Sequence, residues 1–177
     1  MTRAAPREFV LRFAARDIPR WAARFDASQD AALEAGVAAR ARARGWLTKA
    51  EFLALTRWKT PRSQPLCARN EAADIRAISA TALSTPNERL RITVLTLLQG
   101  VGWPIASAIL HWTHRQPYPI LDVRALWSAG IAPPPSAYEF EFWRRYTLWC
   151  RGTASRCGVT MRTLDRALWQ YARHAQP

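Results

Sequence analysis

The stretch Arg91-Ile-Thr-Val-Leu-Thr-Leu-Leu-Gln-Gly-Val-Gly-Trp-Pro-Ile-Ala-Ser-Ala-Ile-Leu-His-Trp112 holds two apolar segments separated by two glycines. Both segments place apolar residues at helical spacing. Gly100 and Gly102 permit a tight turn and a close approach of the backbone to a neighbour, while Val101 can be buried between the two helices. The pattern therefore predicts two helices joined by a short turn over residues 90–112.

The start of the second helix predicts a site for one phosphate. Its first N–H groups have no partner within the helix, and the positive end of the helix dipole adds to them, so a phosphate is bound without reading sequence. Glycine and proline are also ordinary stop and start signals of helices, and that alternative stays open. The residues that this site would use are Gly100, Val101, Gly102, Trp103 and Ser107.

The rest of the chain predicts an all-α fold. Apolar residues recur at helical spacing, alternating β-branched runs are almost absent, and a length of 177 residues with 49% hydrophobic content suits one domain over residues 1–177. Start signals indicate seven to nine helices. Predicted starts include three hydroxyls followed three residues later by glutamate, and one near the C-terminus: Thr48, Thr85, Ser136 and Thr160 or Met161.

The charge points to a polyanionic partner. A net charge of +13 at pH 7 favours nucleic acid, although only Lys49 and Lys59 are lysines, so a coding bias toward arginine is the alternative. The tract Ala38–Arg44 is interpreted as a solvated helix face, with a phosphate-facing role as the alternative. We expect no membrane span, and Met1–Pro6 lacks an apolar signal core, so the expected location is cytoplasmic.

A basic segment with two prolines, residues 58–67, predicts an irregular loop before a helix that is capped near Asn70. Trp58, Lys59 and Arg62 in this loop are candidate nucleic-acid contacts, because aromatic rings stack on bases and cations bind phosphates. Asn70 either caps its helix or reads a base edge near a pocket.

A carboxylate follows the hairpin in Tyr118-Pro-Ile-Leu-Asp122, within the segment 118–128. Asp122 either caps a helix over residues 123–127 or stands in an active site, and the two roles are compatible. Arg124 could pair with Asp122 or hold a phosphate.

The pattern Leu-Gln-Gly-Val-Gly-x-x-x-Ala-x-x-Ile-Leu over residues 98–110 resembles the helix-hairpin-helix of the base-excision DNA glycosylase superfamily that includes endonuclease III and adenine glycosylase. Tyr118-Pro-Ile-Leu-Asp122 is similar to its Phe-Pro-Ile-Leu-Asp segment. The resemblance is specific over Leu90–Trp127. It implies a helix-hairpin-helix glycosylase-like helical domain, duplex DNA with a flipped base as the partner, and Asp122 as the catalytic aspartate that stabilises an oxocarbenium ion or orients water.

Two departures from the superfamily narrow the expected chemistry. Pro104 stands where bifunctional relatives carry a nucleophilic lysine, so water is the expected nucleophile and the expected glycosylase is monofunctional. Cys150 and Cys157 have the spacing of the first two ligands of an iron–sulfur cluster, but the other two are missing and Cys67 cannot complete the set, so no metal and no cofactor are expected.

The remaining expectations concern the flipped base and the competing functions. Trp58 and Trp103 are candidates for stacking, and Asn70 and Tyr118 for a base pocket. His111 and His114 lie three residues apart without an evident third metal ligand. A DNA-binding protein without catalysis and a helical interaction protein are the two alternatives. The expected state is a monomer.

Overall fold

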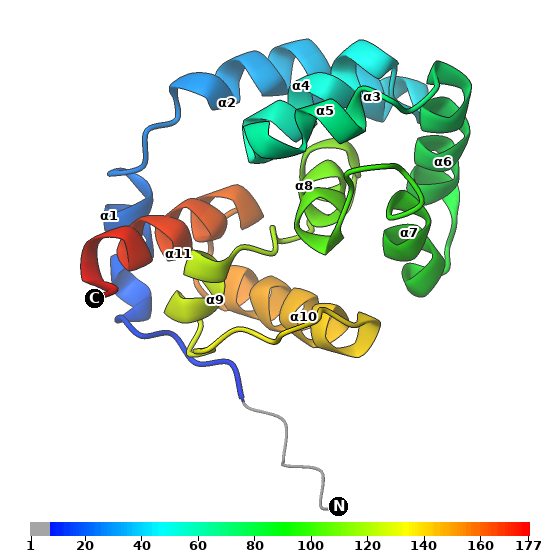
Figure 1. Cartoon of the computed structure of the whole chain (residues 1–177). Coiled ribbons are helices and arrows are strands. Elements are labelled where there is room, and N and C mark those ends of the chain that lie inside the picture. Colours follow the sequence, from blue (N-terminus) through cyan, green and yellow to red (C-terminus); the bar gives the residue numbers. More distant parts are fainter. Residues whose placement is uncertain (1–7) are drawn as a thin grey trace, which may run out of the picture. The chain divides into compact units, whose positions relative to one another are not determined.

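The computed structural model describes residues 8–177, and every regular element within that range is helical (Figure 1). The all-α prediction is confirmed. The described residues form eleven α-helices, more than the seven to nine expected, because residues 18–44 and 61–67 break into several short helices. Contacts divide the chain into two compact units, although the sequence suggested one domain. Unit 1 comprises residues up to Phe25 and from Asp122 onward, and unit 2 comprises Asp26–Leu121.

Unit 2 is built around the second helix of the hairpin. Its elements are α2 (Ser28–Leu33), η2 (Glu34–Ala38), α3 (Ala39–Arg44), α4 (Lys49–Lys59), η3 (Pro61–Ser63), α5 (Gln64–Cys67), α6 (Ala72–Ser84), α7 (Glu88–Leu95) and α8 (Trp103–Thr113). Helix α8 packs against α3, α4 and α7, and α6 lies beside α7 (Figure 1). Residues 105–110 of α8 are all buried, as a helix surrounded by other helices requires.

The predicted helix starts of unit 2 are partly right. Thr48 accepts a hydrogen bond from the Glu51 backbone N–H at 3.2 Å, and the Glu51 carboxylate accepts one from the Thr48 N–H at 2.9 Å, so this capping box is confirmed. The start predicted at Thr85 is wrong by two residues. Asn87 caps α7 instead, because its side-chain oxygen accepts from the Leu90 N–H at 3.0 Å.

Arginines of the tract Ala38–Arg44 make contacts within unit 2. Arg42 contacts the Glu34 carboxylate and donates to the Trp112 carbonyl at 3.2 Å. Arg44 contacts the buried Glu51 carboxylate. These side chains therefore balance carboxylates of the same unit.

Unit 1 joins both ends of the chain. Its elements are η1 (Ala15–Asp17), α1 (Ile18–Ala22), α9 (Val123–Ser128), α10 (Phe140–Arg156) and α11 (Met161–Ala175). Helix α11 packs against α1, α9 and α10 (Figure 1). The N-terminal segment also pairs with the end of α9, because the Val10 and Arg12 N–H groups donate to the Ala129 and Ser128 carbonyls at 3.0 and 2.9 Å.

One predicted helix start of unit 1 is confirmed and one is wrong. Thr160 caps α11 by accepting from the Thr163 N–H at 3.1 Å. The start predicted at Ser136 lies three residues later, with Glu139 as the N-cap of α10 and no side-chain cap. Among residues 8–177, no helix combines the length and apolar character needed to cross a bilayer, and Met1–Pro6 lies outside the described residues.

Candidate nucleic-acid interface

The helical hairpin predicted from the sequence is present in unit 2. Helix α7 ends at Leu95, a tighter turn follows in which the Leu97 and Leu98 N–H groups donate to Val94 and Leu95 at 3.2 Å, and α8 begins at Trp103. Val101 is 5% exposed, so it is buried between the helices as predicted. Leu97 in this turn is 71% exposed, which leaves an apolar side chain at the tip of the hairpin.

Both the backbone conformation and the neighbouring residues require glycine at position 100. Its φ of +79° lies in the left-handed region. A Cβ added there would lie 2.9 Å from the Cys67 Sγ and 3.1 Å from the Cys67 backbone nitrogen. The turn therefore packs its backbone directly against the end of α5.

Asn70 fixes the turn from that same segment. Its amide nitrogen donates to the Gln99 carbonyl at 3.0 Å and to the Cys67 carbonyl at 3.0 Å, and its oxygen accepts from the Gln99 N–H at 2.8 Å. The residue is buried, and Glu71 is the N-cap of α6, so the cap predicted near Asn70 is one residue off. With both ends of its amide used here, Asn70 is a brace of the hairpin and not an exposed reader of a base.

The start of α8 is open in the way a phosphate site needs. Gly102 is the N-cap, with an ordinary φ of −92°, and no side chain caps the helix. A Cβ at Gly102 would find only the Pro104 Cδ, at 3.8 Å. Trp103, expected in the turn, is the first residue of α8 and is half-buried.

Two candidate contacts are internal braces. Ser107 is fully buried, and its hydroxyl donates to the Pro104 carbonyl at 2.9 Å and accepts from the Leu121 N–H at 2.8 Å. Tyr118 is also fully buried, and its hydroxyl donates to the Glu88 carboxylate at 2.7 Å. Neither side chain presents a free polar group to a phosphate or a base, and both hold the segment that leads to Asp122.

The predicted loop over residues 58–67 is largely helical. Trp58 lies in the last turn of α4, half-buried, with its ring 5.4 Å from the buried Trp112 ring at an interplanar angle of 90°. Lys59 ends the same helix and is half-buried, and Arg62 lies exposed in η3. Prolines occupy the first turn of both η3 and α5, where proline is compatible with a helix.

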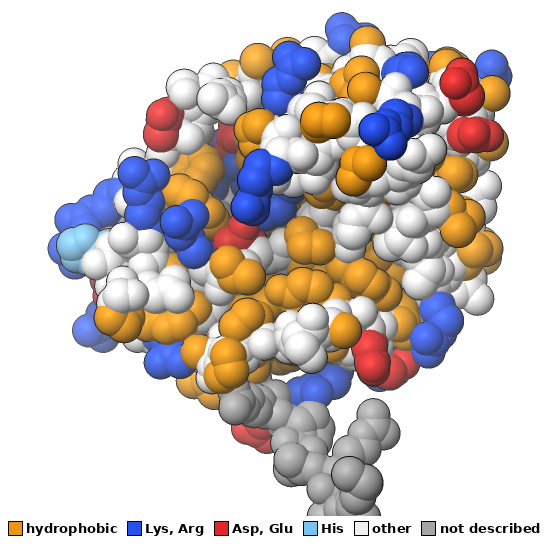
Figure 2. Space-filling model, in the orientation of Figure 1, with side chains coloured by type: hydrophobic (Ala, Val, Ile, Leu, Met, Phe, Trp, Pro, Cys, Tyr) orange, Lys and Arg blue, Asp and Glu red, His pale blue; other side chains and the backbone are white. Residues whose placement is uncertain are grey.

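Arg69 is a cation beside the hairpin that the sequence did not single out. It is exposed and lies between Cys67 and Asn70, the two residues that meet the turn at Gly100 and Gln99. Nothing in the sequence pairs residues 67–70 with the turn, because that contact depends on how α5 packs. In Figure 2, Lys and Arg side chains lie among apolar ones over the region of α4 and α5.

Asp122 is the first residue of the second stretch of unit 1, whereas the hairpin belongs to unit 2. Its carboxylate caps α9 by accepting from the Arg124 N–H at 2.9 Å. Asp122 is half-buried. The Arg124 side chain is exposed and lies 5.1 Å above the Trp169 ring. The capping role of Asp122 is confirmed.

The charge of Asp122 raises the pKa of two tyrosines that were not among the predicted site residues. Burial raises the pKa of Tyr138, and the Asp122 carboxylate raises it further. The pKa of Tyr146, which is fully buried, is raised well above its ordinary value by burial first, and then by its neighbours Cys150, Asp165 and Asp122. Both phenols therefore keep their protons near this carboxylate. No sequence spacing announces them, because they come from the loop before α10 and from α10 itself.

The cysteines and histidines do not gather into a metal site within residues 8–177, where no cluster of three or more metal-ligating side chains occurs. Cys67 and Cys150 are buried and Cys157 is half-buried, all with free thiols. His111 Nδ1 pairs with the Tyr118 carbonyl at 2.7 Å, and His114 Nε2 with Arg91 at 2.7 Å.

A basic cavity of about 540 Å³ lies at the other end of α8 from the hairpin turn, where α3, α6 and α8 end. Two of its arginines bond to carbonyls at the ends of helices. Arg91 donates to the Ala82 carbonyl at 2.8 Å and contacts the Thr85 carbonyl, and Arg42 donates to the Trp112 carbonyl. These guanidinium groups satisfy the unpaired carbonyls of helix C-termini.

No protein-family model, no curated protein and no solved structure matches the chain.

Proposed function

We propose that this protein binds duplex DNA through the α7–α8 hairpin and removes a flipped base as a monofunctional DNA glycosylase, with Asp122 as the catalytic carboxylate. The observation that carries the proposal is the start of α8. A glycine N-cap without a side-chain cap and with open space around it leaves the first turn of an eleven-residue helix accessible to a phosphate oxygen.

The surroundings of the turn support a backbone contact. Asn70 and Gly100 fix the turn against α5, so little conformational freedom remains to be lost on binding. Arg69 and Arg62 are exposed on the segment that packs there and add positive charge. This arrangement suits the sugar–phosphate backbone and carries no group that reads a base, so it predicts affinity without sequence preference.

For catalysis, Asp122 is the group that this chemistry needs. Cleavage of an N-glycosidic bond develops positive charge on the sugar, and a fixed carboxylate stabilises that charge or orients the attacking water. The helix cap fixes one oxygen of Asp122 by the hydrogen bond from the Arg124 N–H. With Pro104 in the position of the lysine nucleophile, water attacks the sugar and an abasic site is the product.

A DNA-binding protein without catalysis is the second candidate, and one observation favours it. Asn70 and Tyr118, the two residues expected to contact a flipped base, are buried and use their polar groups within unit 2. Binding then rests on the hairpin alone, and Asp122 only caps α9.

The hairpin is tested by the affinity of the full chain for a labelled duplex across a salt series. We expect the logarithm of affinity to fall linearly with the logarithm of salt, with a slope of about 0.9 per neutralised phosphate. Gly102→Ala should weaken binding about tenfold, because its methyl group occupies the space that a phosphate would enter. Gly36→Ala is the matched control, since a Cβ there meets nothing within 4 Å. Equal binding by both variants would refute the hairpin contact.

Catalysis is tested with duplexes carrying damaged, mispaired or modified bases, followed by alkaline cleavage of abasic sites. Asn is as good an N-cap as Asp, so Asp122→Asn keeps α9 intact and removes only the charge. We expect base release to fall at least about 100-fold with DNA affinity unchanged. Asp26→Asn is the control, because the exposed Asp26 carboxylate also accepts a backbone N–H, at 3.0 Å from Ser28. Release that survives Asp122→Asn removes the carboxylate from the mechanism, and absence of release from every substrate supports binding alone.

A further inference from the structure

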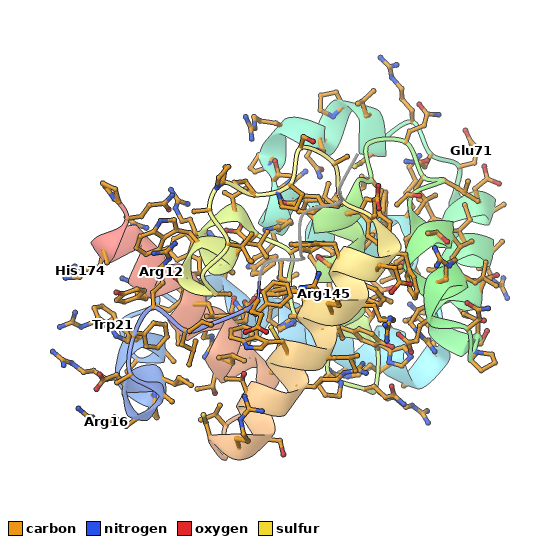
Figure 3. The ribbon with its side chains drawn as sticks, turned by 90° about the horizontal axis from the view of Figure 1, so that it is seen from below. Arg12, Arg16, Trp21, Glu71, Arg145 and His174 are labelled. Atoms are coloured by element: carbon orange, nitrogen blue, oxygen red, sulfur yellow. The ribbon has the colours of Figure 1, made fainter. Side chains whose placement is uncertain are left out.

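Unit 1 carries a second concentration of positive charge that the hairpin does not explain. Six arginines and one histidine on the N-terminal segment, α1, α9 and the C-terminal end of α11 are exposed, and we call them the arginine face: Arg12, Arg16, Arg20, Arg24, Arg124, Arg173 and His174. Figure 2 shows Lys, Arg and His side chains gathered over the end of this unit that holds α1 and the end of α11. Figure 3 shows Arg12, Arg16, Trp21 and His174 at that same end.

The charge of the arginine face is not neutralised within the described part of the chain. In unit 1, Arg144 pairs with Glu141 and Arg162 pairs with Asp165, and neither arginine belongs to the face. The only hydrogen bond that a guanidinium of the face makes within residues 8–177 goes to a carbonyl, from Arg12 Nε to Trp127 at 2.6 Å. The positive potential of the face therefore reaches solvent.

Aromatic rings lie directly beneath these cations. The Arg12 guanidinium carbon is 4.6 Å from the centre of the Trp127 ring, and that of Arg24 is 4.9 Å from the Trp21 ring. Trp169 lies under two guanidinium groups, Arg124 at 5.1 Å and Arg173 at 5.5 Å. The rings also contact one another through Tyr171, whose ring centre is 5.2 Å from Trp21 and 5.9 Å from Trp127.

This stacking prepares the arginines for phosphate. A guanidinium held over a ring has its position restricted before binding, and its N–H donors remain able to make bidentate contacts with phosphate oxygens. Arg16, Arg20 and Arg24 recur every four residues, so cations follow the N-terminal segment as well as the end of α11. A row of cations suits a polymer of phosphates better than a single anion.

A lipid surface fits the face less well. Binding to a bilayer needs a cluster of exposed large apolar side chains that enter the lipid. Those of α11, such as Leu164 and Leu168, are buried, and the exposed ones of unit 1 are single residues on three different segments: Val10, Val123 and Leu148. The Trp127 and Trp169 rings lie under arginines.

We propose that the arginine face of unit 1 binds the sugar–phosphate backbone of a nucleic-acid strand, as a contact separate from the hairpin of unit 2. It does not depend on base removal or on duplex structure. Because contacts to phosphates do not require paired bases, a single strand is expected to bind as well as a duplex.

The test compares two triple variants of the full chain that lose the same charge. One replaces Arg16, Arg24 and Arg173 by alanine, and the control replaces the exposed Arg76, Arg144 and Arg156. The probe is a labelled single-stranded DNA of about 20 nucleotides, long enough to span more than one binding site. We expect the first variant to lose at least about tenfold in affinity and about 2 in salt slope, and the control to lose less than about threefold.

Three further measurements make the outcome decisive. Replacing Arg24 and Arg173 by lysine keeps the charge but removes the planar group, and about a threefold loss is expected; no loss would refute the stacked guanidinium groups as phosphate ligands. Equal losses in the two alanine variants would reduce the effect to net charge and overturn the proposal. A face variant that loses binding to phosphatidylserine vesicles but keeps its affinity for DNA would also overturn the proposal. Repeating the series in Gly102→Ala separates this contact from the hairpin, because failure of the hairpin leaves the difference between the variants intact.

Discussion

At Gly100 the backbone conformation and the neighbouring chain both exclude a side chain. We expect Gly100→Ala to lower the free energy of unfolding by about 2 kcal/mol or more, since it adds a left-handed alanine and a contact of 2.9 Å with the Cys67 Sγ. Gly102→Ala should cost less than about 1 kcal/mol, because only the N-cap preference changes. Urea unfolding measures both. Equal costs would mean that the turn does not pack on α5 as described.

Glu51 should make unit 2 sensitive to acid. Burial raises the pKa of its carboxyl, but hydrogen bonds from Thr48 and the charge of Arg44 outweigh burial and leave the pKa below the ordinary 4.5. Because the folded pKa is the lower one, the stabilisation is complete above about pH 4.5 and is lost as pH falls through the folded pKa.

Urea unfolding between pH 7 and pH 3 measures this effect. Glu51→Gln should flatten the dependence of stability on pH, and Arg44→Met should reduce it in the same direction, because each removes part of the interaction that lowers the pKa. A Glu51→Gln profile parallel to that of the native chain would contradict the assignment.

Single residues also differ in how much of their environment could be predicted from the sequence. Gly100 and Val101 could be predicted, because a left-handed glycine and a buried residue between two helices are local properties of the turn. Asn70, Ser107 and Tyr118 were predicted as contacts to DNA or to a flipped base, whereas their polar groups bond within unit 2. Their partners lie 14 to 30 residues away, and that pairing is a product of packing.

At the scale of helices, the two similar start signals of unit 1 differ in whether the hydroxyl reaches the helix. Thr160→Ala should destabilise unit 1 by about 1 kcal/mol, because it removes the hydrogen bond from the Thr163 N–H. Ser136→Ala should change stability by less than about 0.3 kcal/mol, since α10 begins only at Phe140. Thermal unfolding of both variants checks this. A larger loss at Ser136 would show that the hydroxyl caps in solution.

The helix boundaries show which parts of the fold could be predicted from the sequence. Helix α4 and helix α11 start at Thr caps with matching local geometry, and both were predicted. Helices α5 and α7 deviate, because proline is tolerated in a first turn and because Asn87 competes successfully with Thr85 for the cap. The type of each element follows from periodicity, whereas its first residue follows from which of several nearby caps the tertiary structure selects.

At the scale of the molecule, the two units differ in how the chain builds them. Unit 2 is one continuous segment with its own core around α8, so the fragment 26–121 should be helical and unfold cooperatively, as circular dichroism in urea would show. A matched fragment, 26–117, lacks Tyr118 and Leu121 and with them the bonds to Glu88 and Ser107. It should be less stable by about 2 kcal/mol or more. Equal stability would contradict their role as braces.

Unit 1 behaves differently, because α1 packs on α11 across nearly the full length of the chain. During translation, the hairpin segment can fold as soon as Leu121 has left the ribosome, while the Asp122 unit waits for its last helix, about five seconds later at typical rates of synthesis. In the nascent protein, the hairpin thus folds before the unit that contains Asp122.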